Sequence, residues 1–175
     1  MKAHFAYLNY VIRHKWFVLV AGRTMKVPLW RLLIHDWSKF LPCEWFPYVR
    51  SFYNPNGSKR IWKNRDPWDK MEFDVAWNHH QKANKHHWQY WILINDSDEP
   101  QLRPQIMPEK YWREMIADWM AAGRAITGEW EVWEWYAKNR DKIILHEQIR
   151  KLVDLELESL KRTKDLASRL GFSFP

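Results

Sequence analysis

The sequence predicts an all-α protein, a single-domain helical bundle over residues 1–175, and three observations favour helices. Apolar residues recur at three- and four-residue steps along several stretches of the chain. Only 5 Gly occur, and runs of Val, Ile and Thr, which strands prefer, are rare. Hydrophobic residues make up 46% of the chain and aromatic residues 17%, which is enough to build a core without disulfides.

Three helices are expected in the first third of the chain. The first spans residues 4–21, and Gly22 is a suitable stop. The second runs from about residue 27 to 39, because Pro28 is favoured in the first turn of a helix. The third covers residues 42–53 and carries its apolar side chains on one face.

Long polar loops separate the helices in the remainder of the chain. Residues 54–68 are rich in Asn, Pro, Gly and basic side chains, and residues 95–108 contain three prolines, so both segments are expected to be loops. A short Trp-rich segment covers residues 129–138. Further helices are expected over residues 69–91, 108–126 and 145–170.

Cysteine content and charge limit the classes of function. Cys43 is the single cysteine, which excludes an internal disulfide and a multi-cysteine metal site and fits the cytoplasm. The N-terminus does not resemble a secretory signal, and the apolar stretch 16–22 is too short to cross a bilayer, so no membrane partner is expected. The net charge of +7 favours an anionic partner, such as a nucleotide, a nucleic acid or an acidic surface.

Histidines and carboxylates on the predicted helices are the candidate functional residues. His14 lies within the apolar run VIRHKWFVLV, and Glu114 and Asp118 lie one turn apart on a later helix. His35 and Asp36 are adjacent, and neighbouring side chains on a helix diverge by about 100° unless both lean toward one object. A metal ion is such an object.

A histidine cluster lies between these residues, in the segment HHQKANKHHWQYW. Its four histidines are His79, His80, His86 and His87. On the expected helix, His80, Asn84 and His87 share one face, and Lys82 lies on the neighbouring face. Helices that aim such residues inward would form one metal centre, and imidazole with carboxylate suits Mn, Fe, Co, Ni or Zn.

Structural explanations exist for each of these residues taken singly. A lone histidine in an apolar helix is more often a hydrogen-bonded core residue, and the histidine cluster could face solvent or nucleic acid. Asp118 could join a charge network with Lys110 or Arg124. Metal binding explains all of these residues together. On successive helices the chain presents His, then His-Asp, then a histidine cluster, then Asp, and this order favours metal binding over the separate explanations.

That order resembles the HD superfamily of metal-dependent phosphohydrolases. The resemblance is carried by His14, by His35-Asp36 and by Asp118, and the family's frequent H-D-x-x-K motif ends here at Lys39. From about residue 10 to 150, the chain is also similar to an uncharacterised HD-like family common in tailed-phage and bacterial genomes. The segments that carry this similarity are HDWSKFLPCEWFPYVRSFY with its HDxSKF motif, AWNHHQKANKHHWQYW with its NxHHW motif, and EMIADWMAAGR.

The resemblance implies an all-helical HD-like bundle that binds one or two divalent transition-metal ions. The first-site ligands carried over are His14, His35, Asp36 and Asp118. His80 and His87 match the extra histidines of two-metal members, which usually come from separate helices. The sequence therefore leaves open which of the four clustered histidines bind.

The expected function is that of a metal-dependent phosphohydrolase acting on a small anionic phosphate ester, with a nucleotide favoured and a nucleic acid less so. Asp36 would bridge metals or orient the nucleophilic water, and Lys39 would pair with a phosphate oxygen. Lys82 and Asn84 would contact substrate, and Glu114 would hold a ligand histidine in one tautomer. An HD-type di-iron oxygenase and a non-catalytic phage-type binding protein are the alternatives. The metal, the substrate and the oligomeric state stay open.

Overall fold

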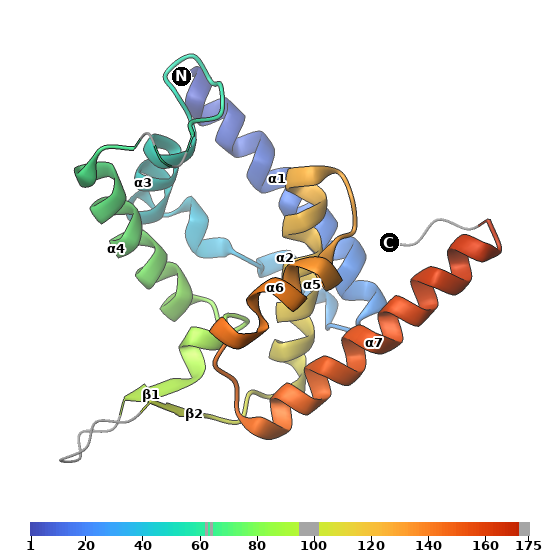
Figure 1. The fold of residues 1–175 in the computed structure, drawn as a ribbon. Helices are drawn as coiled ribbons and strands as arrows, with labels where there is room; N and C mark the ends of the chain where they lie inside the picture. The colour runs from blue at the N-terminus through green and yellow to red at the C-terminus, as the bar shows by residue number, and fades with distance from the viewer. Residues whose placement is uncertain (62, 64, 95–101, 172–175) are drawn as a thin grey trace.

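The computed structural model describes residues 1–61, 63, 65–94 and 102–171. These residues form seven α-helices and one two-stranded sheet, so the prediction of an all-α fold is confirmed (Figure 1). The helices are α1 (Lys2–Thr24), α2 (Leu29–Ile34), α3 (Pro42–Phe52), α4 (Pro67–Ala83), α5 (Glu109–Thr127), α6 (Val132–Asn139) and α7 (Glu147–Arg169). The short 3-10 helices are η1 (Trp37–Phe40), η3 (Trp88–Trp91) and η4 (Arg140–Lys142).

The long helix α1 contributes to two separate apolar clusters. Tyr7 and Val11 in its first half pack with buried residues of α3 and α4, whereas Val18 and Ala21 in its second half pack with α5, α6 and α7. In Figure 1, α3 and α4 lie on one side of the molecule, and α5, α6 and α7 lie on the other. His14 occupies the same buried stripe of α1 between Val11 and Val18, so this polar residue marks the junction of the two clusters.

The predicted continuous helix over residues 27–39 is wrong, because the chain breaks at the His-Asp pair. α2 ends at Ile34, and His35 follows with an extended backbone, at φ −49° and ψ 133°. Asp36 is left-handed, at φ 55° and ψ 29°, a conformation that Asp tolerates better than most residues, and η1 begins after it. The break removes the helical divergence between the two neighbours and allows both side chains to point to one centre.

The predicted helix over residues 69–91 is also too long. α4 begins at Pro67 after the N-cap residue Asp66, whose side chain accepts a hydrogen bond from the Asp69 amide. It ends at Ala83, and the Asn84 side chain donates to the His80 carbonyl at 2.9 Å. The chain then turns through residues 84–87 into η3, so the second pair of clustered histidines lies beyond the helix.

The expected loop over residues 95–108 is partly wrong, because it contains a strand. β1 (Ile92–Ile94) pairs antiparallel with β2 (Leu102–Pro104), and Leu93 lies opposite Arg103. Residues 95–101 of that segment lie outside the described residues. The helices expected near residues 4–21, 42–53, 108–126 and 145–170 are confirmed as α1, α3, α5 and α7.

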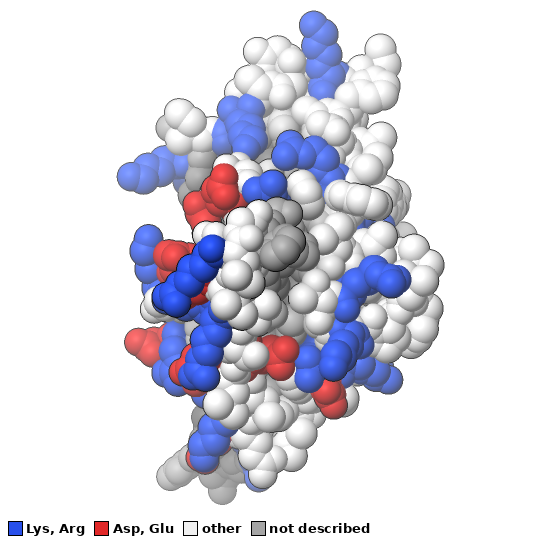
Figure 2. Space-filling model, turned by 90° about the vertical axis from the view of Figure 1, so that its right-hand side faces the viewer, with Lys and Arg blue, Asp and Glu red and all other residues white. Residues whose placement is uncertain are grey.

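Basic side chains do not gather in one patch on the face shown in Figure 2. Lys and Arg are dispersed there, and Asp and Glu lie among them. A nucleic-acid track would instead gather basic residues along one stripe. Within the described ranges, no helix combines the length and the apolar character that crossing a membrane requires.

Candidate metal centre

Buried histidines and carboxylates meet at the junction of the two apolar clusters. Helix α1 supplies His14, α4 supplies His80, and α5 supplies Asp118. The break after α2 supplies His35 and Asp36, and both are almost completely buried, with exposed fractions of 2% and 1%. The turn directly after α4 adds His86 and His87, so four stretches far apart in sequence contribute to one polar centre.

The first group of potential ligands contains His14, His35, Asp36 and Asp118. One nitrogen or oxygen atom from each of these side chains lies within 4.8 Å of the others. His14 Nε2 is 3.3 Å from Asp36 Oδ2 and 3.0 Å from Asp118 Oδ1. His35 Nε2 lies 3.4 Å from the same two carboxylate oxygens. This set is the one that the HD resemblance implied.

The second group contains Asp36, His80, His86 and His87, again with ligand atoms within 4.8 Å of one another. His80 Nε2 is 3.2 Å from Asp36 Oδ1, and His86 Nε2 is 3.3 Å from the same oxygen. Asp36 therefore directs Oδ2 toward the first group and Oδ1 toward the second. A carboxylate in this position can bridge two metal ions.

The atoms that converge in the two groups lack ordinary hydrogen bonds. Among the described residues, these buried atoms have no hydrogen-bond partner: Nε2 of His14, His35, His80, His86 and His87, and Oδ1 of Asp36. A buried polar atom left unpaired costs about 1–3 kcal/mol, so a cluster of them is expected only where something else satisfies them. Imidazole nitrogen and carboxylate oxygen are the donor types that divalent transition metals accept, so these residues fit one or two such ions.

Glu114 on α5 fixes the orientation of two histidines from behind. His35 Nδ1 donates to Glu114 Oε1 at 3.0 Å, and His86 Nδ1 lies 3.4 Å from the same oxygen. Arg31 binds the other oxygen, with Nε at 2.7 Å and Nη2 at 2.6 Å. Because Nδ1 faces the carboxylate in each ring, Nε2 is left to face the centre, which is the arrangement common around metal-bound histidines. His35, His86 and Glu114 also form a third group of potential ligands. Glu114 already accepts a hydrogen bond from His35 Nδ1, so we interpret it as a residue that orients the histidines and does not itself bind metal.

Glu44 on α3 orients His80 on α4 in the same way. It is fully buried, and His80 Nδ1 donates to its Oε2 at 2.8 Å. Its other oxygen accepts from His79 Nδ1 at 2.6 Å, and the His79 ring is 43% exposed. His79 therefore lies outside the centre, and His80 lies within it.

Lys39 on η1 forms a buried ion pair with the shared carboxylate. Its Nζ donates to Asp36 Oδ2 at 2.5 Å. Burial alone would lower the pKa of Lys39, but Asp36 raises that pKa well above its usual range. Burial alone would raise the pKa of Asp36, and His35 and Lys39 hold it well below its usual range. Both groups are therefore ionised at neutral pH.

The carboxylates of the centre attract positive charge. Burial would lower the pKa of His35 and His86, but Asp36, Asp118 and Glu114 raise the pKa of His35 well above its usual range, and Asp36 and Glu114 raise that of His86. A metal ion at these two rings would therefore replace a proton. Burial, with the neighbouring His86 and His80, lowers the pKa of His87 well below its usual range, so this ring is neutral and can bind metal. Despite its burial, hydrogen bonds from His35 and His86 lower the pKa of Glu114 to about 2. The centre and its supports hold more carboxylates than Lys and Arg side chains, namely Asp36, Glu44, Glu114 and Asp118 against Lys39 and Arg31.

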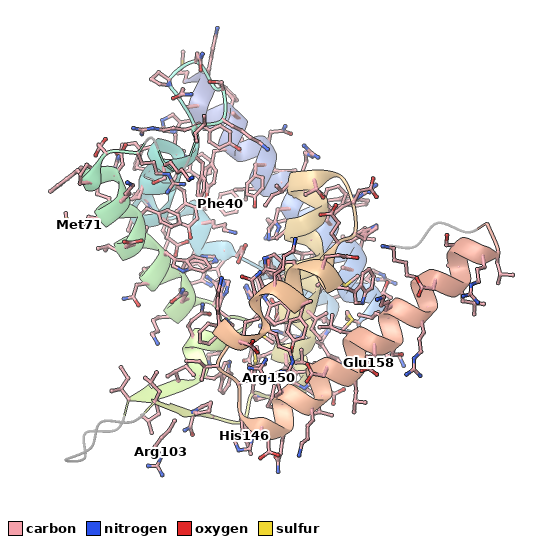
Figure 3. The ribbon with its side chains drawn as sticks, viewed as in Figure 1. Phe40, Met71, Arg103, His146, Arg150 and Glu158 are labelled. Carbon is pink, nitrogen blue, oxygen red and sulfur yellow. The ribbon has the colours of Figure 1, made fainter. Side chains whose placement is uncertain are left out.

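The structure brings together most of the residues predicted from sequence. Those in the centre or in direct contact with it are His14, His35, Asp36, Lys39, His80, His87, Glu114 and Asp118. Lys82 does not reach the centre, because it is exposed and donates to the Gln89 carbonyl at 2.9 Å. Asn84 is buried beside His80 and donates to Ser38 Oγ at 2.6 Å, so it holds the end of α4 in place. His146 caps α7, at the lower end of that helix in Figure 3.

Sequence reasoning missed three participants. A continuous helix over this segment places His86 on another face from His80, so the sequence alone does not identify His86 as a ligand. It also does not indicate that Glu44 and Arg31 support the centre. The signal for Glu44 is its position as the only charged residue in the stretch FLPCEWFPYV, where a carboxylate must find a buried partner. Arg31 gives no comparable local signal, because its partner Glu114 lies 83 residues away.

Comparison with known families identifies the family of the chain. The chain matches the model of the family described as "Family of unknown function (DUF5662)" over residues 3–159, a span that contains every residue of the centre. Neither the curated proteins nor the solved structures that were searched gave a match.

Proposed function

Because the chain belongs to DUF5662, a family of unknown function, we propose its role from the chemistry of the centre. It is a metal-dependent phosphohydrolase that acts on a small phosphate ester, with a nucleotide as the favoured example. The observation that supports this proposal is the convergence of unpaired buried histidine Nε2 atoms and Asp36 Oδ1 in two groups that share Asp36.

Two sets of side chains would hold the metal. The first is His14, His35, Asp36 and Asp118, and the second is Asp36, His80, His86 and His87. A divalent ion bound there would lower the pKa of a water molecule toward neutrality and withdraw charge from a phosphoryl oxygen. The order of these residues along the chain, with its HD-like resemblance, supports hydrolysis of a phosphate ester as the reaction.

The surrounding residues have defined tasks in this proposal. Lys39 carries its positive charge at the edge of the centre and also lines the neighbouring cavity, where it pairs with a phosphate oxygen of the substrate. Glu114 and Glu44 hold His35 and His80 with Nε2 directed inward. Burial of these supports keeps water away from the hydrogen bonds that set the geometry.

Hydrolysis is tested with purified protein, added Mn²⁺ or Co²⁺, and a panel of nucleotides and simple phosphate monoesters. We expect phosphate release that falls to background in His35→Ala and Asp36→Ala, because each removes a proposed ligand. His146→Ala serves as the matched control, since this histidine caps α7 away from the centre. Full activity in either ligand variant would contradict the proposal.

A di-iron oxygenase is the second candidate, and the richness of the second group in histidine favours it. Together with the first group, His80, His86, His87 and the shared Asp36 suit a pair of iron ions as well as a pair of Mn²⁺ or Co²⁺ ions. Anaerobic purification followed by iron analysis and electron paramagnetic resonance separates the two candidates. Two bound irons with an oxygen-dependent spectrum and no phosphate release would favour the oxygenase. A non-catalytic binding protein would be indicated if neither metal nor activity is found.

A further inference from the structure

A cavity of about 450 Å³ lies directly beside the metal centre, between α1, α3, α4 and α5. His14, His80, His87 and Asp118 form part of its wall, so a molecule in the cavity would lie against both groups of potential ligands. The volume is in the range of small-molecule sites in proteins. It is suited to one compact molecule.

Two tyrosine hydroxyls in the wall are buried and unpaired. Tyr7 and Tyr48 line the cavity with exposed fractions of 1% and 5%, and their rings lie 6.0 Å apart. Within the described part of the chain, neither hydroxyl has a hydrogen-bond partner. A tyrosine hydroxyl is protonated at neutral pH, so both can donate a hydrogen bond. Buried hydroxyls are normally paired, so two unpaired ones on side chains that line one cavity point to a ligand.

Lys39 lines the same cavity as the two tyrosines. Its Nζ lies 2.5 Å from Asp36 Oδ2, so the ammonium is held at the side of the cavity that borders the centre. One ammonium and two hydroxyl donors therefore belong to the wall of one cavity, and oxygen atoms of a phosphoryl group are the acceptors that such donors suit.

Aromatic side chains form much of the remaining wall. Phe52, Phe73 and Trp77 line the cavity, with the Phe52 and Phe73 rings edge-on at 5.3 Å and Tyr48 at 5.2 Å from Phe73. A flat ring packs favourably against such walls.

We propose that the cavity binds a compact phosphate monoester with one flat, uncharged ring, and that Tyr7 and Tyr48 donate hydrogen bonds to its oxygen atoms. This inference rests on the proposed phosphohydrolase function and names the substrate class of the same site. Lys39 and the two hydroxyls hold the phosphoryl end, and Phe52, Phe73 and Trp77 enclose the ring. The tyrosines are thereby specificity-determining residues.

Calorimetric titration of the Mn²⁺-loaded protein with two non-hydrolysable probes tests the proposal. Phenylphosphonate and methylphosphonate carry the same charged group, so their difference reports the ring alone. We expect phenylphosphonate to bind at least about tenfold more tightly, because the phenyl ring is buried against apolar walls. Tyr7→Phe and Tyr48→Phe should each weaken binding of phenylphosphonate about three- to tenfold. Their melting temperatures should equal or exceed that of the parent protein, because each removes an unpaired buried hydroxyl.

Tyr136→Phe is the matched control, because this buried tyrosine lies outside the cavity and donates to Asp154 at 2.7 Å. Its affinity for phenylphosphonate should not change. Equal affinity for the two probes, or unchanged affinity in both cavity variants, would overturn the proposal. Tyrosine-dependent phenylphosphonate binding without hydrolysis of any ester would support the cavity assignment and refute the phosphohydrolase. If glycerol phosphate and phenyl phosphate are hydrolysed at equal kcat/KM, and phenylphosphonate binding does not change in the tyrosine variants, the phosphohydrolase is supported and the cavity assignment is refuted.

Discussion

Replacing Glu114 with Gln tests whether a buried support sets the geometry of the centre. The Glu114 side chain is 1% exposed and binds Arg31 through contacts of 2.7 and 2.6 Å, so the substitution leaves a buried guanidinium without its anion. Losing one partner of such a pair costs about 3–5 kcal/mol of unfolding free energy. The amide also faces His35 Nδ1 with the wrong donor pattern, which favours the tautomer whose Nε2 carries a proton. Loss of a support of this kind typically lowers metal affinity ~10- to 100-fold.

Two assays test Glu114→Gln. Urea denaturation of the metal-free protein, monitored by circular dichroism, measures stability, and calorimetric titration with Mn²⁺ measures metal affinity. Glu109→Gln on the same helix is the matched control, because Glu109 is 68% exposed and pairs with Arg113 one turn away. That exposed pair should contribute no more than about 0.5 kcal/mol. The reasoning is refuted if Glu114→Gln destabilises the protein no more than the control does, or if it binds Mn²⁺ as tightly as the parent protein.

Three further predictions concern packing, pH and metal. Gly22→Ala should destabilise the protein by about 1–3 kcal/mol, because the added Cβ would lie 2.3 Å from Leu32 Cδ2, whereas Gly123→Ala meets nothing closer than 3.8 Å and should be neutral or stabilising in urea denaturation. Despite partial burial, the pKa of Asp154 is lowered by the hydrogen bonds that its carboxylate accepts from Arg140 and Tyr136. The stability that the ionised Asp154 contributes is therefore complete above its unfolded-state pKa of about 3.9, and it is lost as the pH falls through the lower folded-state pKa. The difference in urea midpoint between the parent protein and Asp154→Asn should accordingly shrink below about pH 4. Removing metal with a chelator should lower the melting temperature, and adding Mn²⁺ should restore it with a dependence on metal concentration; a melting temperature indifferent to both would count against a bound ion.

Periodicity predicted the long helices because their burial follows the chain locally. Helix α1 buries Tyr7, Val11, His14 and Val18 along one stripe, so its extent could be inferred from sequence alone. The break at Asp36 could not, because nothing but the tolerance of Asp for a left-handed backbone marks it, and the helical pattern continues on both sides.

The end of α4 was missed for a related reason. The segment after Ala83 holds no Gly or Pro, and Asn84 was the single local sign that the helix stops. This error also obscured the role of His86, which reaches the centre only because the chain turns. The ligand types and their order were predictable, since polar residues inside apolar helices stand out. Glu44 stands out in the same way, as a charged residue in an apolar stretch, but its role depends on contact with His80, 36 residues later, which no local pattern indicates.

Metal analysis of the purified chain is the most direct test of the central claim that these side chains form a metal site. After incubation with Mn²⁺ and removal of free ions, mass spectrometry of the digested protein should find between one and two ions per chain. Asp36→Asn should lose most of them, because its carboxylate is shared by both groups of ligands. An equal metal content in the parent protein and in Asp36→Asn, or a parent protein that retains no metal at all, would contradict the account.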